Sequence, residues 1–372
     1  MKPLSPLLAL VLLACGEKDP GDDTHSAPDD TEDSGGPDDT GTPLGQSHAV
    51  VATVNADYTA GALSTVDLRD FSVEQHTTIT TDPNVRVSGD KVFVMNRVDN
   101  SIRIYEPGSW GTPVKEFAVG VNPREAVLCE GKLFVTLYGE SIVGIYDLDS
   151  GTLRGAVDIS SYDTHGDGTP EASTAVELEG TLYVGLNNLD ASYHSSEGSV
   201  IAIDCSTEQV TGEWSVGGNA DVTLAGGTLV ARWGNWYDPV DWSAAIDGEI
   251  GTLDPTSGFQ PTISEVDLGM NLHSVAFNAD GHGVVLATST DGTDTYSVHC
   301  IDRSDWSLTE LATVDEFLSD VAASDDGLIW IAARPHWING GTGGVRAIDP
   351  AECTWASDMI ETPLPPVALD FY

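Results

Sequence analysis

The chain has 372 residues, with 59 Asp and Glu against 15 Lys and Arg, and a formal net charge of −44. This charge argues against a nucleic-acid-binding protein, which needs a basic surface. A hydrophobic content of 40% is enough for a folded core, and 39 glycines and 19 prolines indicate many turns, as in an all-β protein. After the N-terminus, no apolar run approaches the roughly 20 residues of a membrane-spanning helix.

The N-terminus has the layout of an exported protein. Residues 1–15 read MKPLSPLLALVLLAC, a charged residue followed by a short apolar run, as in a signal peptide. The last four letters, LLAC, resemble the lipobox of bacterial lipoproteins. This resemblance implies that a signal peptide, 1–14, is removed and that Cys15 carries a lipid. It also favours the outer membrane, because Gly16 stands where Asp would favour the inner membrane. An ordinary secretory signal is the alternative.

An acidic segment follows the signal peptide. Ten acidic residues lie between Glu17 and Asp39 against the single Lys18, and the triplet DDT occurs three times. Such a segment cannot form a core. We therefore expect residues 15–47 to be a lipidated cysteine and a disordered tether that holds a domain away from a membrane. A cation-binding tail is the alternative.

From residue 48 onward, apolar segments with the period of a β-strand alternate with turn residues. One unit recurs seven times: a first strand, a variable loop, and a second strand that ends on an acidic residue. The first strands are 49–55, 91–97, 132–138, 181–187, 228–234, 283–289 and 328–334. The second strands end at Asp67, Glu106, Asp147, Asp204, Asp254, Asp302 and Asp349. These acids are 39 to 57 residues apart, the size of a four-stranded propeller blade.

Two more strands complete each unit. Outer strands such as 114–120 and 211–217 follow the second strands, and inner strands precede the first strands at 85–89, 125–131, 173–180, 221–227, 273–281 and 319–327. The first unit lacks an inner strand, which the C-terminal segment 365–372 has the pattern to supply. The sequence therefore predicts an all-β, seven-bladed β-propeller of four-stranded blades over 48–372, closed by its C-terminal strand. A β-sandwich or an open solenoid is the alternative.

The repeats resemble a known family. The segments VFVMNRVDNSIRIYEPGS and LFVTLYGESIVGIYDLDSG and the turn VGVNPREAV (119–127) are similar to the surface-layer or YVTN-type propeller repeats. The resemblance covers about 48–372 and implies the same fold. It implies little about activity, because that family includes lactonase-like enzymes, cofactor-free binding modules and uncharacterised cell-surface proteins.

One face of such a propeller is the expected binding site. Loops between first and second strands and loops that enter the inner strands meet there, at the mouth of the central channel. The candidate ligand-binding residues in these loops are Arg97, Arg124, Arg232, Trp233, Trp236, His273, Arg334, His336 and Trp337. Arginine suits a carboxylate or phosphate, and the rings suit a sugar-like ligand. The alternative is that the arginines pair with local acids such as Asp99, Glu125 and Asp238.

The segment 161–173 is a candidate calcium loop. Asp163, Asp167 and Glu171 offer oxygen ligands around two flexible glycines. The spacing is not that of an EF-hand, and a plain turn is the alternative. Four histidines of the same face, His165, His194, His273 and His336, match no zinc motif and are equally well explained as dispersed surface residues. Calcium is therefore the only cofactor that the sequence suggests.

The cysteines indicate an oxidising compartment. With Cys15 lipidated, four remain, and an exported protein can pair them in two disulfides. We favour a bridge between Cys300 and Cys353, which come from neighbouring blades. Cys129 is equally well explained as a free buried thiol.

The preferred interpretation is a monomeric binding or scaffolding domain of the cell envelope, periplasmic or surface-exposed, and attached to the membrane only by its lipid. Its partner would be a protein or a small anionic or sugar-like ligand at the channel mouth. The alternative is a lactonase-like or other hydrolytic enzyme that uses the same mouth. The sequence contains neither the G-x-S-x-G nor the H-E-x-x-H signature of hydrolases.

Overall fold

The computed structural model describes residues 46–238, 240, 243–290, 295–336 and 343–372. Residues 44–372 form one unit. The signal peptide, Cys15 and the tether lie outside the described residues, so the expectations for them remain predictions. No helix in the described ranges is long and apolar enough to cross a membrane.

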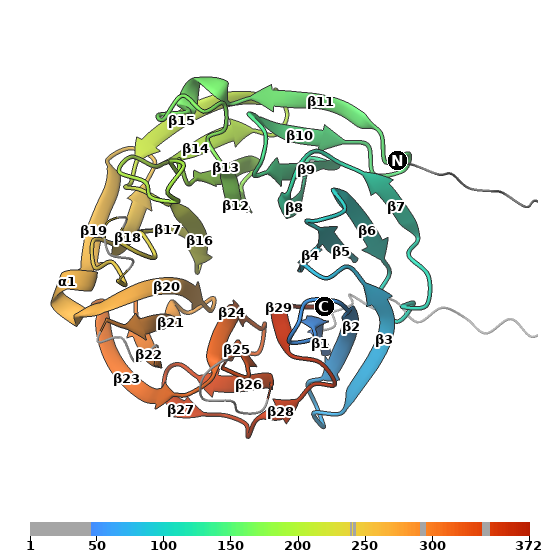
Figure 1. Ribbon diagram of the computed structural model, residues 1–372, viewed down its shortest axis with the longest axis vertical. Helices are drawn as coiled ribbons and strands as arrows, with labels where there is room; N and C mark the ends of the chain where they lie inside the picture. Colours follow the sequence, from blue (N-terminus) through green and yellow to red (C-terminus); the bar gives the residue numbers. More distant parts are fainter. Residues whose placement is uncertain (1–45, 239, 241–242, 291–294, 337–342) are drawn as a thin grey trace, which may run out of the picture. The chain divides into compact units, whose positions relative to one another are not determined.

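Seven antiparallel sheets surround a central axis (Figure 1). From the axis outward, blade 1 consists of β29 (Pro366–Phe371), β1 (His48–Val54), β2 (Gly61–Asp67) and β3 (Val73–Ile79), and blade 2 of β4 (Pro83–Ser88), β5 (Lys91–Asn96), β6 (Ser101–Tyr105) and β7 (Lys115–Ala118). Blade 3 consists of β8 (Pro123–Cys129), β9 (Lys132–Leu137), β10 (Ile142–Tyr146) and β11 (Leu153–Asp158), and blade 4 of β12 (Ala172–Leu178), β13 (Thr181–Leu186), β14 (Ser199–Asp204) and β15 (Gln209–Ser215).

Blades 5 to 7 continue the ring. Blade 5 consists of β16 (Asp221–Ala225), β17 (Thr228–Trp233), β18 (Glu249–Asp254) and β19 (Gly258–Ser264), and blade 6 of β20 (Met270–Phe277), β21 (His282–Ser289), β22 (Tyr296–Asp302) and β23 (Ser307–Val314). Blade 7 consists of β24 (Phe317–Ala323), β25 (Ile329–Arg334), β26 (Gly344–Asp349) and the short β27 (Thr354–Trp355) and β28 (Ile360–Glu361), which both pair with β26. The sequence did not predict the two helical turns, η1 (Ser160–Tyr162) and α1 (Glu265–Leu268).

The C-terminal strand closes the ring. β29 pairs antiparallel with β1, with Val51 opposite Leu369 and Ala49 opposite Phe371. Blade 1 therefore takes its inner strand from the end of the chain and its other three strands from the start. This confirms the predicted seven-bladed propeller and its closure, in which each of the seven blades has an inner strand paired with its first strand.

The core lies between neighbouring blades. Strand β5 is apolar over four consecutive residues, 92–95, and all four are fully buried, because both faces of the sheet pack against another blade. Outer strand β15, in contrast, alternates exposed with half-buried residues. Between blades 1 and 2, for example, Val50 and Leu63 pack in one cluster with Val92 and Tyr105.

The acids that end the second strands form the turns to the outer strands. Asp204 Oδ1 accepts the backbone N–H of Thr207 at 2.7 Å, and Asp147 Oδ1 accepts that of Ser150 at 2.7 Å. Asp254, Asp302 and Asp349 make equivalent contacts. An aspartate that bonds the amides of the next residues is a standard turn former. These aspartates are therefore structural.

Two disulfides join neighbouring blades. Cys300, in β22, is bonded to Cys353, in the turn before β27, which is the pairing favoured from the sequence. Cys129, at the end of β8, is bonded to Cys205, directly after β14. The free-thiol interpretation of Cys129 is therefore wrong, because the register of blades 3 and 4 brings two turns on the same face together.

Candidate functional site

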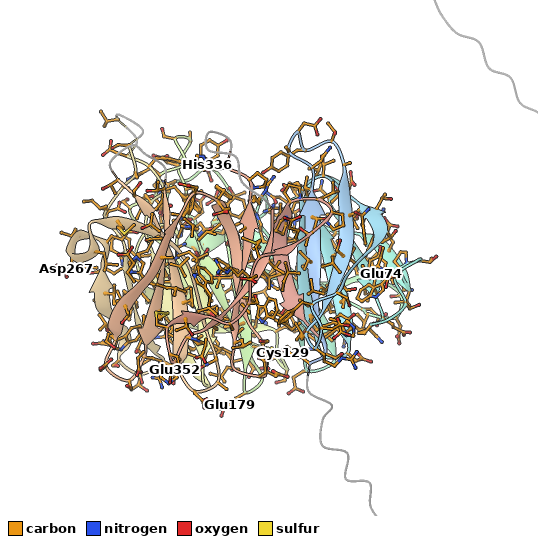
Figure 2. The ribbon with its side chains drawn as sticks, turned by 90° about the horizontal axis from the view of Figure 1, so that it is seen from below. Glu74, Cys129, Glu179, Asp267, His336 and Glu352 are labelled. Carbon is orange, nitrogen blue, oxygen red and sulfur yellow. A yellow bond between two sulfur atoms is a disulfide. The ribbon has the colours of Figure 1, made fainter. Side chains whose placement is uncertain are left out.

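The two ends of the ring differ in their loops. One end carries the loops between first and second strands, such as 55–60, 187–198 and 234–238; we call this end the mouth. Figure 2 shows His336 at this end, and Cys129 and Glu179, in the turns between inner and first strands, at the opposite end. Ser47 precedes β1, so the chain enters the domain at the end opposite the mouth.

Two of the four predicted arginines are neutralised by acids. Arg97 forms an ion pair with Asp82, and Arg232 with Asp221. The Nη1 group of Arg232 also donates to the carbonyl of Leu272 on the next blade at 2.8 Å. Local pairing was the alternative interpretation, and it holds for these two residues. The acids are not the expected ones, because Asp82 and Asp221 lie across the hairpins from the arginines.

The other two arginines pack on tyrosine rings. Arg334 donates to the hydroxyl of Tyr58 and lies 4.7 Å from the centre of its ring. The guanidinium of Arg124 lies 4.3 Å from the centre of the Tyr138 ring, a cation–π contact. It makes no hydrogen bond or ion pair with any residue that the structure describes, and its Nε is buried without a partner. Burial and the nearby Arg97 lower the pKa of Arg124.

The predicted aromatic residues have different environments. Trp233 is partly buried; its Nε1 donates to Glu249 at 3.2 Å and it packs in the core between blades 4 and 5. Trp236 is exposed, and its ring centre lies 5.4 Å from that of His273. His336 is buried, and Trp337 lies outside the described residues. Trp236 is therefore the predicted tryptophan of the described mouth that a ligand can reach directly.

His273 is a neutral histidine beside the channel. It is buried, and its ring lies 5.3 Å from that of Tyr296. Burial, with a contribution from Arg232, lowers the pKa of His273 to about 3. Its Nε2 has no hydrogen-bond partner in the described part of the chain. An uncharged imidazole at this position can donate one hydrogen bond to a ligand or accept one from it.

The acids of the candidate calcium loop take part in a turn. Asp163 accepts the backbone N–H groups of His165, Gly166 and Gly168 at 2.7 to 3.0 Å. Glu171 accepts the N–H of Leu189 at 2.9 Å and, like Asp167, the hydroxyl of Thr169. In the described ranges, no three His, Cys, Asp or Glu residues are grouped as a metal site. The contacts fit the alternative interpretation, a turn, and calcium binding by these residues stays a prediction.

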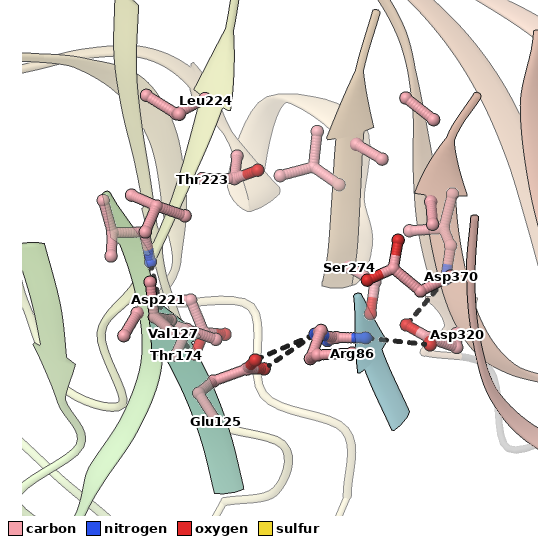
Figure 3. A pocket seen from close by; sticks show the side chains of 18 of the residues that line it. Arg86, Glu125, Val127, Thr174, Asp221, Thr223, Leu224, Ser274, Asp320 and Asp370 are labelled. Atoms are coloured by element: carbon pink, nitrogen blue, oxygen red, sulfur yellow. Dashed lines mark hydrogen bonds and ion pairs between the residues drawn. The ribbon is translucent and has the colours of Figure 1, made fainter. Parts of the chain in front are cut away.

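The axis of the ring contains a cavity of about 650 Å³ lined by the inner strands. Each of the seven inner strands contributes a polar side chain: Arg86, Glu125, Thr174, Asp221, Ser274, Asp320 and Asp370. Figure 3 shows Arg86 between Glu125 and Asp320, with Asp370 close by. Arg86 Nε donates to Glu125 at 2.8 Å, and Nη1 lies 3.7 Å from Asp320.

This channel cluster contains more acid than base. Burial raises the pKa of Glu125 to about 7, and it also raises the pKa values of Asp320 and Asp370. A single guanidinium cannot neutralise three buried carboxylates. The cluster therefore binds a proton more readily than carboxylates in water do. The sequence analysis missed the cluster. A charged residue within an otherwise apolar inner strand, such as Arg86 in VRVSG, was the available signal.

The comparisons with known proteins support the fold alone. No family model and no curated protein match the sequence. Among solved structures, a protein of Bacteroides uniformis proposed to be a 6-phosphogluconolactonase aligns over 88% of this chain and 100% of its own, with TM-score 0.64 and 11% identity. A similarly named protein of Bacteroides fragilis covers 90% and 100%, with TM-score 0.57 and 11% identity. The protein is a seven-bladed β-propeller.

A third similar structure carries a different name. The β-propeller domain of Cps50 (Swd1) from Myceliophthora thermophila aligns over 77% of this chain and 93% of its own, with TM-score 0.55 and 13% identity. Proteins of such different names share this fold, so the fold is compatible with binding and scaffolding and does not select among activities. The function has to be inferred from the mouth and the channel.

Proposed function

We propose that the protein is a lipid-anchored envelope protein of the YVTN-type propeller class, whose mouth binds a protein or a small anionic or sugar-like ligand. The observation that carries this proposal is the position of the exposed aromatic residues. Of the five that the described residues contain, four lie in mouth loops: Tyr58, Tyr193, Trp236 and Tyr237, with 50, 78, 40 and 52% of their surfaces exposed. Exposed rings gathered on one face are typical of a recognition surface.

The direction of the chain is compatible with binding at the mouth. Ser47 is at the end of the ring opposite the mouth. The point at which the chain enters the domain is therefore separate from the mouth loops. Labelling with a fatty acid in growing cells tests the anchor: we expect label on the wild type and none on Cys15→Ser. Equal labelling of both would contradict lipidation at Cys15.

A ligand-observed NMR screen tests binding at the mouth. The full chain in detergent micelles is mixed with a set of neutral and acidic oligosaccharides, and saturation transfer is compared between variants. We expect transfer that is lost in Tyr193→Ser or Trp236→Ser. The matched control is Leu153→Ser, because Leu153 is exposed on the outer strand β11. Equal transfer in all variants would place any binding elsewhere.

Hydrolysis of a lactone is the second candidate. Two similar structures carry the name of a lactonase, and Glu125 in the channel has a pKa of about 7, which suits proton exchange at neutral pH. The assay is pH-stat titration with 6-phosphogluconolactone and glucono-δ-lactone. Hydrolysis that Glu125→Gln abolishes would support this activity, and hydrolysis no faster than in buffer would contradict it.

A further inference from the structure

The starting point is the missing acid partner of Arg124. The chain carries 59 acids against 15 basic residues, so most arginines of the mouth could find a carboxylate, and Arg97 and Arg232 do. Arg124 instead has only the face of Tyr138 within the described structure. A mostly buried guanidinium without an acceptor is costly. An anion bound from solution would provide the missing hydrogen-bond acceptor.

Tyr193 is held in an exposed position in the mouth loop of the next blade. Its backbone has a φ of 59°, a left-handed conformation that non-glycine residues seldom adopt. The turn that enforces it is built by Asp190, whose Oδ1 accepts the N–H groups of Ser192 and His194 at 2.7 and 3.1 Å. Backbone strain that presents an exposed ring is common at binding sites.

The two tyrosines come from neighbouring blades. Burial raises the pKa of Tyr138 to about 12, with weaker effects from Arg124, Glu171, Asp221 and Tyr193. Tyr138 follows β9 of blade 3, and Tyr193 lies in the loop between β13 and β14 of blade 4. The mouth side of blade 3 therefore carries a buried ring with an unpaired guanidinium, and the mouth loop of the next blade carries an exposed ring.

The charges at the mouth favour an anionic ligand. The ion pairs Arg97–Asp82 and Arg232–Asp221 are each neutral, and Arg124 and Arg334 have no ion pair in the described structure; Arg334 donates to the Tyr58 hydroxyl, whereas Arg124 Nε has no partner. Ten acids and two lysines lie before residue 48, so the domain has 49 acids and 13 basic residues and a net charge of about −36. This surface repels a polyanion more strongly than a ligand with one acidic group.

We propose that Arg124, Tyr138 and Tyr193 form a subsite for a single carboxylate or phosphate carried on a sugar ring. The guanidinium would take the anion in two parallel hydrogen bonds, and the exposed ring of Tyr193 would pack against the sugar. This inference rests on the proposed function and adds the ligand class and the residue that selects it.

The test uses three probes: glucuronate, glucose 6-phosphate and glucose. Binding to the full chain is followed by isothermal titration and by the NMR signal of the arginine Nε–H groups. We expect both acidic sugars to bind at least about tenfold more tightly than glucose and to shift the Arg124 signal. In Arg124→Gln this preference should disappear, while glucose binding is unchanged. Comparison of the two acids shows whether carboxylate or phosphate is the better ligand.

Two variants keep the test interpretable. Arg103→Gln is the matched control, because Arg103 is paired with Glu116 on the outer part of blade 2, and it should retain the preference. Tyr193→Ser, a change at an exposed position, should weaken all three sugars. Equal affinity for the three sugars, or a preference that survives Arg124→Gln, would overturn the subsite while leaving binding at the mouth intact. No binding of either acid at about 10 mM would also overturn it; the oligosaccharide screen judges the proposed function separately.

Discussion

Asp370 Oδ2 accepts the backbone N–H of Val87 at 2.7 Å, so the last strand of the chain is bonded to the inner strand of the next blade. Asp320 Oδ2 does the same for Leu369 at 2.9 Å. Ser88 and Thr174 accept the N–H groups of Leu128 and Val222 at other blade boundaries. Polar side chains of the channel therefore connect neighbouring blades near the axis, in addition to the apolar contacts further out.

The first prediction concerns this connection. Asp370→Ala should lower the free energy of unfolding by about 1–3 kcal/mol, because the buried N–H of Val87 loses its acceptor. Asp370→Asn keeps an acceptor oxygen and removes one of three carboxylates around Arg86, so it should cost much less. Urea unfolding of both variants measures the difference. An equal loss in the two would show that the charge, and not the hydrogen bond, is what matters.

The second prediction is a pH dependence of stability. Burial raises the pKa of Glu125 from 4.5 to about 7, so the folded state binds more protons than the unfolded state between these values. Stability should therefore fall as the pH rises from about 4.5 to about 7, with the Glu125 contribution on the order of 2–3 kcal/mol. Glu265, whose pKa burial also raises to about 7, acts in the same direction.

The matching variant is Glu125→Gln. Urea unfolding at a series of pH values should show a shallower decline for this variant than for the wild type. Below about pH 4 the slope should reverse in both proteins, because hydrogen bonds from Thr207 and Ser206 lower the pKa of Asp204 to about 2. Identical profiles between pH 4.5 and 7 would mean that Glu125 titrates normally.

The third prediction concerns the disulfides. The bridge between Cys129 and Cys205 closes a segment with a sequence separation of 76 residues, and removing a crosslink of this length costs about 2–4 kcal/mol. The double variant Cys129→Ala/Cys205→Ala should therefore unfold at lower denaturant concentration, and a reducing agent should destabilise the wild type more than this variant. A reducing agent without effect on the wild type would argue against the bridges.

The fold could be predicted because its signals are local. Each strand shows its own apolar pattern and each turn its own acid, as Asp147 and Asp204 do, and the unpaired first unit indicated where the C-terminal strand must lie. The site depends on contacts between blades. Arg86 contacts Glu125, 39 residues away, and Asp320 on the far side of the ring closure, and no local pattern encodes such a pair.

The same reason explains the arginines of the mouth. The sequence showed that these arginines stand at the ends of strands. The prediction that they share one face of the propeller used only this position. Which arginine has an acid partner depends on hairpin register: Asp221 lies opposite Arg232 in the pairing of β16 and β17, whereas Arg124 and Arg334 pack on tyrosine rings and have no ion pair in the described structure. The sequence alone left all four equivalent.

The most direct test of the account is hydrogen–deuterium exchange of the full chain, with and without glucuronate at saturating concentration. We predict slower exchange in the mouth loops, above all at residues 187–198 and 234–238, and no change in the opposite turns that contain Cys129 and Glu179. No protection at all would overturn the acidic-sugar subsite, and protection confined to the opposite turns or the outer strands would contradict the claim that the mouth is the binding face.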